Sequence, residues 1–330
     1  MRAAVVGCGR VGSTMADDPL MAGDVFTHAE AYSKSEKTDL VALCDTDEKK
    51  LRAAGKRWNV AALFDNPRDM MTAAGPDIVS ICTPTPTHAA IARDLMNVEK
   101  PPRAILCEKP LAATLEDAEE IVRLAKENGV VLATIYMRRY AENFRRLKTL
   151  LDSGELGHVQ AVTGWYIGGT FHNGTHWFDM FRWLVGEVKE LNGRNMLRES
   201  GDDPTYDVAM WTDDGVLGTL RACDARRFTL FEMDIVLEGG RVQITDSGHD
   251  INVSRPQPSP RYSGYVELQP TGMNLGNRRD LMLNAVEDAV DAVTLHREPA
   301  CTGADGLAAI RIADAAARSV KIRQNVEISG

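Results

Sequence analysis

Short apolar runs alternate with helical patterns along the first 135 residues, and this alternation limits the fold more than any other feature. The runs are residues 3–7, 39–44, 77–82, 104–107 and 130–135. Each is continuous rather than interrupted by polar residues, which is typical of strands buried on both faces of a parallel sheet. Helical patterns, such as residues 86–97 and 114–129, lie between the runs. We therefore predict a doubly wound α/β domain with a parallel sheet.

The pattern changes after about residue 120, which predicts a second domain. Residues 205–224 and 227–248 resemble strands whose turn signals, DDG and EGG, favour hairpins of a largely antiparallel sheet. Segment 252–275, which holds four prolines, is expected to be a loop, and helices are expected at about 277–295 and 304–321. We predict a Rossmann domain over residues 1–120 and an α+β domain with an open-faced sheet over residues 121–330. An open sheet face predicts burial by a second copy, hence a homodimer or homotetramer.

Charge and composition exclude several classes of partner. The net charge of −9 argues against nucleic acid and anionic membranes, which both select a basic patch. No apolar run reaches the roughly 18 residues that a membrane span needs. The six cysteines are scattered without a C-x-x-C pair, as in proteins of reducing compartments. We expect a cytoplasmic protein that binds a small molecule and binds neither nucleic acid nor membrane.

The hexapeptide GCGRVG follows the first apolar run and precedes a helical pattern. In this context, a G-x-G-x-x-G pattern predicts a dinucleotide site. Gly7 permits a tight turn, Gly9 lets the backbone approach a pyrophosphate, and Gly12 lets the helix pack closely on the strand. Arg10 and Val11 lie in the first helical turn, where free N–H groups and the positive end of the helix dipole attract phosphate.

Asp45 ends the second apolar run, where a carboxylate can accept hydrogen bonds from ribose hydroxyls and repel a 2′-phosphate. NAD is therefore favoured over NADP. Gly12 and Asp45 are 33 residues apart, whereas about 20 is usual. We interpret residues 16–32, ADDPLMAGDVFTHAEAY, as an insertion within the first helix. The alternative for Asp45 is an ordinary turn residue at the end of a strand.

Two histidines, His172 and His176, are one helical turn apart and would share a helix face. They could ligate a metal, act as an acid and a base, or pack. The metal alternative is the weakest, because Asn173 stands where a zinc helix H-E-x-x-H has its glutamate and no third ligand is close in sequence, so we predict no metal. Asp179 either orients the ring of His176 or is a solvated carboxylate. Most apolar residues of this helix are expected to be core: Trp177, Phe178, Met180, Phe181, Trp183 and Leu184.

Three further motifs accompany GCGRVG and ALCD, namely CTPTPTH (82–88), CEKP (107–110) and GTHWFD (174–179). Together they resemble the glucose-fructose oxidoreductase / inositol dehydrogenase (Gfo/Idh/MocA) family, and the resemblance runs from residue 1 to about 320. The resemblance implies an NAD(P)-dependent dehydrogenase that acts on a hydroxyl of a sugar, a cyclitol or a related polyol.

The resemblance also implies roles for particular residues. Lys109 would reach the nicotinamide ribose and the substrate hydroxyl, and His176 would be the general base. His172 stands where the family often has an aspartate, so it has either a catalytic, substrate-binding role or a structural one. Further cofactor contacts are expected from Thr83, Pro84, His88 and Glu108, and substrate contacts from Tyr136, Arg139 and Asn173. The alternatives are that His88 caps or packs and that the Arg138-Arg139 pair lies on a solvated helix face.

The chemistry suits these residue types. A hydroxyl that gives hydride to nicotinamide must also lose its proton, and a neutral imidazole is matched to that step at pH 7. If a helix begins near residues 173–175, its dipole disfavours the imidazolium of His176. The ammonium of Lys109 would stabilise the developing alkoxide. Two alternatives stay open: a non-catalytic NAD-binding regulator of the same fold, and a nucleotide-sugar dehydrogenase with a larger pocket.

Overall fold

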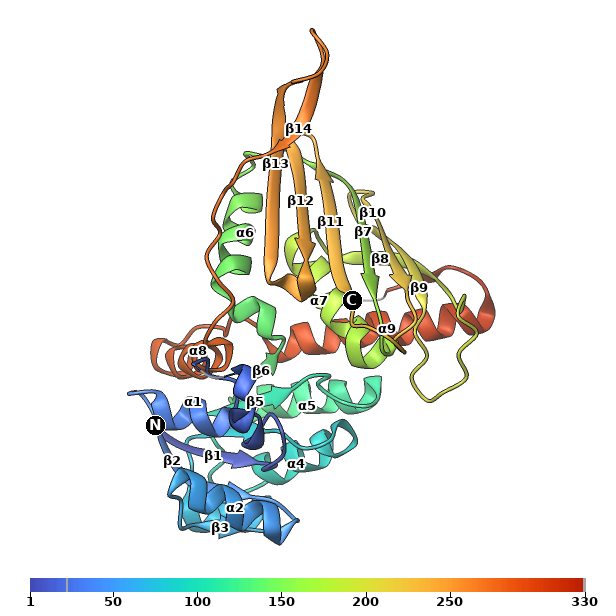
Figure 1. Cartoon of the computed structure of the whole chain (residues 1–330). Coiled ribbons are helices and arrows are strands. Elements are labelled where there is room, and N and C mark those ends of the chain that lie inside the picture. Colours follow the sequence, from blue (N-terminus) through green and yellow to red (C-terminus); the bar gives the residue numbers. More distant parts are fainter. Residues whose placement is uncertain (22, 329–330) are drawn as a thin grey trace. The chain divides into compact units, whose positions relative to one another are not determined.

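The computed structural model describes residues 1–21 and 23–328 and divides the chain into two compact units. Unit 1 comprises residues 1–141 and 279–310, and unit 2 comprises residues 142–278 together with the chain from Arg311 onward (Figure 1). This division differs from the predicted boundary at residue 120. The chain stays in unit 1 through the sixth strand of its sheet and returns to unit 1 after residue 278. This return depends on contacts between distant segments, so the local sequence pattern does not predict it.

Unit 1 is built on a six-stranded, wholly parallel sheet with strand order β3-β2-β1-β4-β5-β6. The predicted doubly wound fold is therefore confirmed. The five predicted strands form within two residues of their expected bounds, and β3, only two residues long, was missed. The strands are β1 (Arg2–Val6), β2 (Asp39–Cys44), β3 (Leu63–Phe64), β4 (Ile78–Ile81), β5 (Ala104–Glu108) and β6 (Val131–Ile135). The strand order reverses between β1 and β4, which is where open α/β sheets bind ligands.

Helices cover both faces of this sheet. On one face, α1 and α8 pack on each other and on a core that includes Val5, Leu43 and Ile135. A second group, α3, α4 and α5, packs together elsewhere on the unit. Several helices begin at a side chain that caps the first turn, such as Asp47 before α2 and Thr114 before α5. The helices are α1 (His28–Lys34), α2 (Glu48–Trp58), α3 (Pro67–Ala74), α4 (His88–Met96), α5 (Leu115–Glu127) and α8 (Leu281–Leu295), with α9 (Gly303–Ile322) beginning here and ending in unit 2.

The predicted insertion interrupts the first helix without breaking its hydrogen bonds. Ser13 N–H donates to Gly9 O at 2.9 Å, which closes an opening turn. The helix resumes at α1, where His28 and Ala29 N–H donate to Val11 O and Gly12 O at 3.0 Å each. In a continuous α-helix those donors would be residues 15 and 16, an offset of 13 residues. Subtracting 13 from the 33 residues between Gly12 and Asp45 leaves 20, the usual spacing. Residue 22, within this segment, lies outside the described residues.

Unit 2 is built on a nine-stranded sheet with strand order β14-β13-β12-β11-β7-β10-β9-β8-β15. Only β7 and β10 pair in parallel, so the predicted largely antiparallel sheet is confirmed. Hairpins form at both predicted turns, DDG between β9 and β10 and EGG between β11 and β12. The strands are β7 (Val159–Tyr166), β8 (Val188–Arg194), β9 (Asp207–Thr212), β10 (Leu217–Ala222), β11 (Phe231–Leu237), β12 (Gly240–Thr245), β13 (Asp250–Pro258), β14 (Val266–Pro270) and β15 (Val326–Glu327).

The prediction of a loop over residues 252–275 is wrong, because β13 and β14 form a hairpin there. Prolines lack the N–H that a central strand needs, but an outer ribbon tolerates them. Beyond Ser254, β13 pairs with β14 alone, and this is where Pro256 and Pro258 lie. In Figure 1 the two strands extend past their neighbours in the sheet.

One face of the unit 2 sheet packs on α7 (Thr175–Leu184) and α9. Trp177 stacks over Gly164 of β7, where an added Cβ would lie 2.2 Å from its indole nitrogen, and Phe181 lies similarly over Gly218 of β10. The predicted core residues of α7 are buried, apart from the half-buried Trp183. Helix α6 (Glu142–Asp152) contacts α7. The two strand glycines bring α7, which carries His176, close to the sheet.

Candidate dinucleotide-binding and active site

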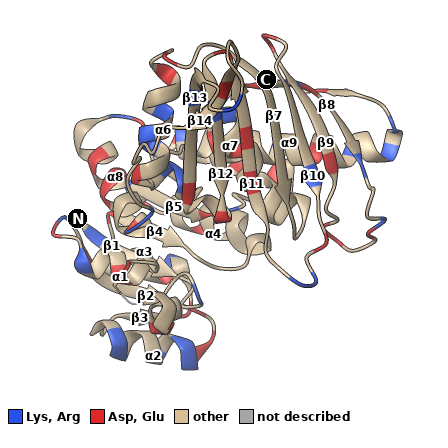
Figure 2. Ribbon diagram, turned by 45° about the horizontal axis from the view of Figure 1, so that its top comes forward, with Lys and Arg blue, Asp and Glu red and all other residues tan. Residues whose placement is uncertain are grey.

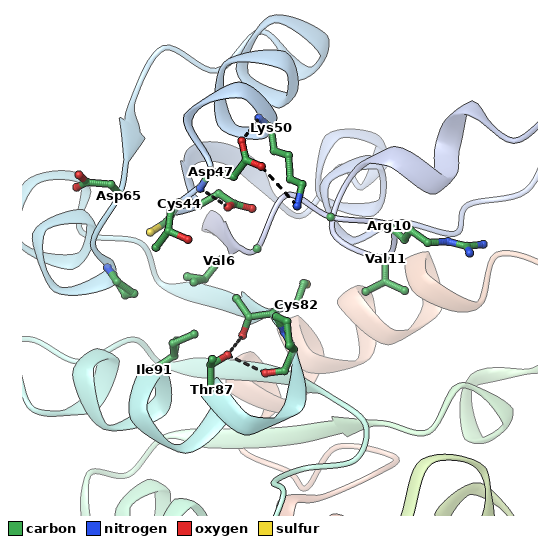
Figure 3. A pocket seen from close by; sticks show the side chains of 17 residues that line it. Val6, Arg10, Val11, Cys44, Asp47, Lys50, Asp65, Cys82, Thr87 and Ile91 are labelled. Carbon is green, nitrogen blue, oxygen red and sulfur yellow. Dashed lines mark hydrogen bonds and ion pairs between the residues drawn. The ribbon is translucent and has the colours of Figure 1, made fainter. Parts of the chain in front are cut away.

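A cavity of about 650 Å³ lies at the carboxyl ends of β1, β2 and β4, beside the reversal in strand order. It brings together most of the predicted cofactor residues, of which Arg10 and Val11 are labelled in Figure 3. These are Gly7, Gly9, Arg10, Val11, Asp45, Thr83 and Pro84. The remaining lining residues were not singled out from the sequence: Val6, Cys44, Thr46, Asp47, Lys50, Asp65, Pro67, Cys82, Thr87 and Ile91.

The three glycines of the motif have different neighbours. Gly7 has φ +98°, and a Cβ there would lie 2.7 Å from the carbonyl carbon of Cys82. A Cβ on Gly12 would lie 1.9 Å from Gly7 O. A Cβ on Gly9 would meet nothing within 4 Å. The fold therefore requires Gly7 and Gly12, whereas Gly9 leaves open space at the lining of the cavity.

Asp45 is a fixed acceptor on the wall of this cavity. Its Oδ2 accepts the Cys8 N–H at 2.7 Å and its Oδ1 accepts the Asp47 N–H at 2.8 Å. Each carboxylate oxygen has a further lone pair, so the group can still accept ribose hydroxyls. Lys50, whose Nζ lies 3.6 Å from Asp47, adds one cation beside the carboxylates of Asp45, Asp47 and Asp65. Lys50 lies in the first turn of α2, five residues after Asp45, and this position in the sequence could have identified it as a lining residue.

The thiols of Cys8 and Cys44, next to the glycine loop, are expected to be unreactive. Burial is the main cause that raises the pKa of Cys8 to about 12, with Asp45 adding to the effect. Burial likewise raises the pKa of Cys44 to about 12. Both groups therefore remain protonated near neutral pH and are poor nucleophiles.

A buried chain of hydrogen bonds ends at Glu108, the residue before Lys109. Tyr32 Oη and Ser80 Oγ are 2.7 Å apart, and Ser80 Oγ is 2.8 Å from His28 Nδ1. His28 Nε2 is 2.9 Å from Glu108 Oε1. Tyr32, Ser80 and His28 are fully buried. His28 was not predicted because it lies within the predicted insertion of residues 16–32, whereas the helix already resumes at His28, and because it meets Glu108 only in the fold.

His88 is buried in unit 1, where its ring contacts the loop that carries Lys109. The ring is 1% exposed, Nε2 is 2.9 Å from Thr83 O, and Nδ1 is 3.1 Å from Pro110 O. This is the geometry of the packing alternative. Within the described chain, His88, Glu108 and Lys109 are not among the residues that line the 650 Å³ cavity.

Tyr136 and Arg139, both expected substrate contacts, lie inside unit 1 at 1% and 6% exposure. Arg139 Nη2 lies 3.0 Å from Asp305 Oδ1, and Nη1 donates to Ala300 O at 3.2 Å. The alternative of a solvated helix face for the Arg138-Arg139 pair is wrong, because both side chains are buried.

In unit 2, His176 is the second residue of α7, so the predicted helix start near residues 173–175 is confirmed. Its half-buried ring meets Phe231 edge-on, with the ring centroids 6.3 Å apart. Asp179 is 2% exposed, which excludes the solvated carboxylate. The imidazole is therefore partly accessible, and it lies one residue after the point where a π-helix, Thr170–Gly174, runs directly into α7.

The segment before α7 is a π-helix, Thr170–Gly174, that exposes His172. Asp203 holds this turn, since its carboxylate accepts the N–H groups of Phe171 and His172 at 2.8 Å each. The Asn173 side chain donates to Ile167 O at 2.8 Å. Asp203 was missed because its loop carries no signal that links it to residues thirty positions earlier.

Residues 1–21 and 23–328 contain neither a cluster of metal-ligating side chains nor a helix that could span a membrane. No group of three or more His, Cys, Asp or Glu side chains there is arranged to hold a metal ion. No helix within this part of the chain is long and apolar enough to cross a bilayer.

Comparison with known proteins gives consistent matches over both units. A family model described as "Oxidoreductase family, NAD-binding Rossmann fold" matches residues 1–136, and the corresponding "C-terminal alpha/beta domain" model matches residues 148–328. Myo-inositol 2-dehydrogenase of Thermotoga maritima is 27% identical, with 99% of this chain and 98% of that protein covered. Inositol 2-dehydrogenase of Rhizobium meliloti is 26% identical, with 100% and 99% covered.

Among solved structures, the WlbA dehydrogenase from Bordetella pertussis in complex with NADH and UDP-GlcNAcA superposes with a TM-score of 0.79. It is 18% identical, and 100% of this chain and 99% of that chain are covered. At this identity the likeness shows a shared fold.

The cavity at the strand reversal, the glycine cradle and the matched models define the class of the protein, which is an NAD-binding oxidoreductase. Both family models match in chain order and together cover most of the sequence. The chain belongs to the Gfo/Idh/MocA family, as its motifs indicated.

Proposed function

We propose that this protein is an NAD-dependent dehydrogenase that oxidises a ring hydroxyl of a sugar, a cyclitol or a related polyol, or reduces the matching ketone. The observation that carries the proposal is that two relatives matched over their full lengths are named inositol 2-dehydrogenases. The dinucleotide cavity with its open Gly9 cradle supports the cofactor half of the proposal.

The proposed chemistry assigns one task to each motif. When bound, NAD accepts hydride from the carbon that bears the hydroxyl. His176 takes the hydroxyl proton, and the ammonium of Lys109 stabilises negative charge on the same oxygen. His172, exposed one turn before His176, binds substrate or assists the proton transfer.

We further propose that NAD is preferred over NADP. Asp45 is held by two backbone N–H groups and cannot turn away from the cavity without losing both hydrogen bonds. Asp47 and Asp65 also line the cavity, so its three carboxylates outnumber its two cations, Lys50 and Arg10, and a 2′-phosphate would meet net repulsion.

The test is a substrate panel of myo-inositol, aldoses and UDP-sugars with NAD and with NADP, read as formation of reduced cofactor. His176→Ala is expected to lower kcat by about 10²–10⁴-fold, the typical contribution of a general base. Lys109→Ala should lower kcat strongly as well. His158→Ala, at an exposed histidine of unit 2, is the matched control and should leave turnover unchanged. Full turnover by His176→Ala would refute the assignment of the base.

Two other functions are distinguished by the same panel. A nucleotide-sugar dehydrogenase is favoured by the likeness to a structure that holds NADH and UDP-GlcNAcA, and it predicts turnover of UDP-sugars alone. A non-catalytic regulator predicts tight NAD binding without turnover of any substrate.

We also propose that the protein is a cytoplasmic homodimer or homotetramer formed through the open face of the unit 2 sheet. Side chains that point to this face, such as Thr163, Trp165 and Ala209, are half-exposed, whereas their sequence neighbours on the other face are mostly buried. Sedimentation of the purified chain measures the state directly.

A further inference from the structure

The first turn of the π-helix that carries His172 takes its hydrogen bonds from a distant loop. The leading N–H groups of a helix have no acceptor inside the helix, and a side chain just before the helix often caps them. Here the residue at that position is Gly169, which has no side chain to offer. Its φ of +92° also belongs to the left-handed region that favours glycine. The turn therefore depends on acceptors from elsewhere in unit 2.

Asp203 supplies two of these acceptors. Its Oδ1 accepts the Phe171 N–H and its Oδ2 accepts the His172 N–H, at 2.8 Å each. Hydrogen bonds to an ionised acceptor are stronger than those between neutral groups. Gly169 leaves room for the carboxylate, because a Cβ there would lie 2.1 Å from Asp203 Oδ2. The glycine that cannot cap the turn is thus the residue that admits the carboxylate.

The next two residues of the same loop hold the same turn. Pro204 O accepts both the N–H and the hydroxyl of Thr170, at 3.2 and 2.6 Å. Thr205, which is 2% exposed, accepts the Gly169 N–H on its Oγ1 at 3.0 Å. We call residues 203–205 the clamp, because they satisfy four successive N–H groups at the start of the π-helix.

The π-helical form decides how this turn presents its side chains. Gly169 O accepts the Gly174 N–H at 3.0 Å, a bond that spans five residues where an α-helix spans four. Such turns are rare and occur frequently at functional sites. His172 is exposed on this turn, and α7 begins directly after it with His176 as its second residue. A change of the turn to another helical form would therefore alter the direction of His172 relative to His176.

We propose that Asp203 is a positioning residue of the oxidoreductase reaction, which holds His172 where it meets the substrate. This inference rests on the proposed function, in which His172 binds substrate or assists the proton transfer. Asp203 acts through the backbone of the turn and not through contact with the substrate. A cap with only a structural role would contribute to stability and leave kcat unchanged.

The test compares two charge-matched variants of the full chain. Asp203→Asn keeps the shape of the side chain but turns an NH₂ group, which cannot accept a hydrogen bond, toward one of the two N–H groups. Asp202→Asn removes the same charge from the adjacent, exposed residue. Both aspartates lie in the loop between β8 and β9, whose acidic and basic residues are coloured in Figure 2.

Turnover is measured with the substrate that the wild type oxidises fastest in the panel of myo-inositol, aldoses and UDP-sugars with NAD. We expect Asp203→Asn to lower kcat/KM by about 10- to 100-fold, since a displacement of about 1 Å in a site can lower the rate about 10²-fold. Asp202→Asn should leave kcat/KM unchanged.

A double-mutant cycle shows whether Asp203 acts through His172. If it does, Asp203→Asn should change kcat/KM little in a His172→Ala background, because the group that it positions is already absent. Independent effects of the two substitutions would overturn the inference. Full turnover by His172→Ala would overturn it too, since the clamp would then position nothing that the reaction uses.

Hydrogen–deuterium exchange of a peptide that covers residues 168–174 reports on the turn without reference to turnover. Exchange there should be faster in Asp203→Asn than in the wild type or in Asp202→Asn, because the substitution removes an acceptor from the turn. Unchanged exchange would refute the clamp.

Failure of this inference and failure of the proposed function give different results. Wild-type turnover that Asp203→Asn retains in full refutes the inference alone, and a wild type that oxidises no substrate refutes both. NAD binding, measured in every variant, should match the wild type and shows that unit 1 is folded. If Asp203→Asn unfolds, Thr205→Val removes the acceptor of the Gly169 N–H with little change of shape and gives the same reading.

Discussion

Gly9→Ala separates what the fold requires of the glycine motif from what the dinucleotide requires. A Cβ at this position meets nothing within 4 Å, and the backbone there needs no left-handed conformation. Replacing glycine at such a site restricts the unfolded chain and stabilises a protein by about 0.4–1 kcal/mol. We therefore expect Gly9→Ala to fold as well as the wild type or slightly better.

Affinity for NAD should fall in the same variant. The new methyl group would fill the space beside the N–H groups of the opening turn and displace a phosphate from them. Loss of one hydrogen bond to a charged group costs about 1.5–3 kcal/mol, which is roughly a 10- to 150-fold rise in Kd. Quenching of intrinsic fluorescence measures the Kd, and chemical denaturation measures the free energy of unfolding.

Gly12→Ala is the matched control, because its Cβ would lie 1.9 Å from Gly7 O and the backbone must shift. Overpacking of this kind costs about 1–3 kcal/mol or more, so stability and NAD affinity should fall together. NAD binding of wild-type strength by Gly9→Ala would refute the cradle. A Gly9→Ala protein destabilised by more than about 1 kcal/mol would contradict the open space on which the prediction rests.

Three further perturbations test other parts of unit 1. Asp45→Ser should move the ratio of NAD to NADP affinity toward NADP by at least about tenfold, measured by titration with each nucleotide. His28→Asn should lower the free energy of unfolding by about 1–3 kcal/mol, because Glu108 loses a buried donor, whereas His28→Gln, which can reach Glu108, should recover most of it. Burial raises the pKa of Cys8 and of Cys44 from 9.0 in the unfolded chain to about 12 in the folded protein. The stability they contribute is therefore complete below pH 9 and declines as pH rises toward 12. Denaturation from about pH 8 to 11 should show this decline, and Cys8→Ala/Cys44→Ala should reduce it.

Much of unit 1 was predictable because its signals are local. Five of its six strands lie in continuous apolar runs, as expected where side chains on both faces of a parallel sheet are buried. The sixth, β3, is two half-buried residues long and has no such run. The turn at GCGRVG depends on close contacts within the motif and with the segment that follows β4, since a Cβ on Gly12 would meet Gly7 and a Cβ on Gly7 would meet Cys82. The cavity at the strand reversal could therefore be located from the sequence, and Asp45 is among the residues that line it.

The remaining features depend on contacts between distant segments. Residues 279–310 return to unit 1 because α8 packs on α1, β5 and β6, none of which is near in sequence. His28 meets a residue 80 positions away, and Asp203 supports a turn about thirty positions earlier. The hairpin at β13 was missed for a different reason, because prolines usually indicate a loop but are accommodated in an outer ribbon.

Because the first helix is interrupted and then resumes in register, the segment between its two parts can vary in length without changing the helix. The N–H groups of His28 and Ala29 donate to the carbonyls of Val11 and Gly12, as they would in a continuous helix from which 13 residues were absent. Holding the ends of such a detour together costs roughly 2 kcal/mol of closure entropy, which the resumed helix must offset. A chimera that exchanges this segment for one of another length would therefore keep the helical spacing of the dinucleotide fingerprint.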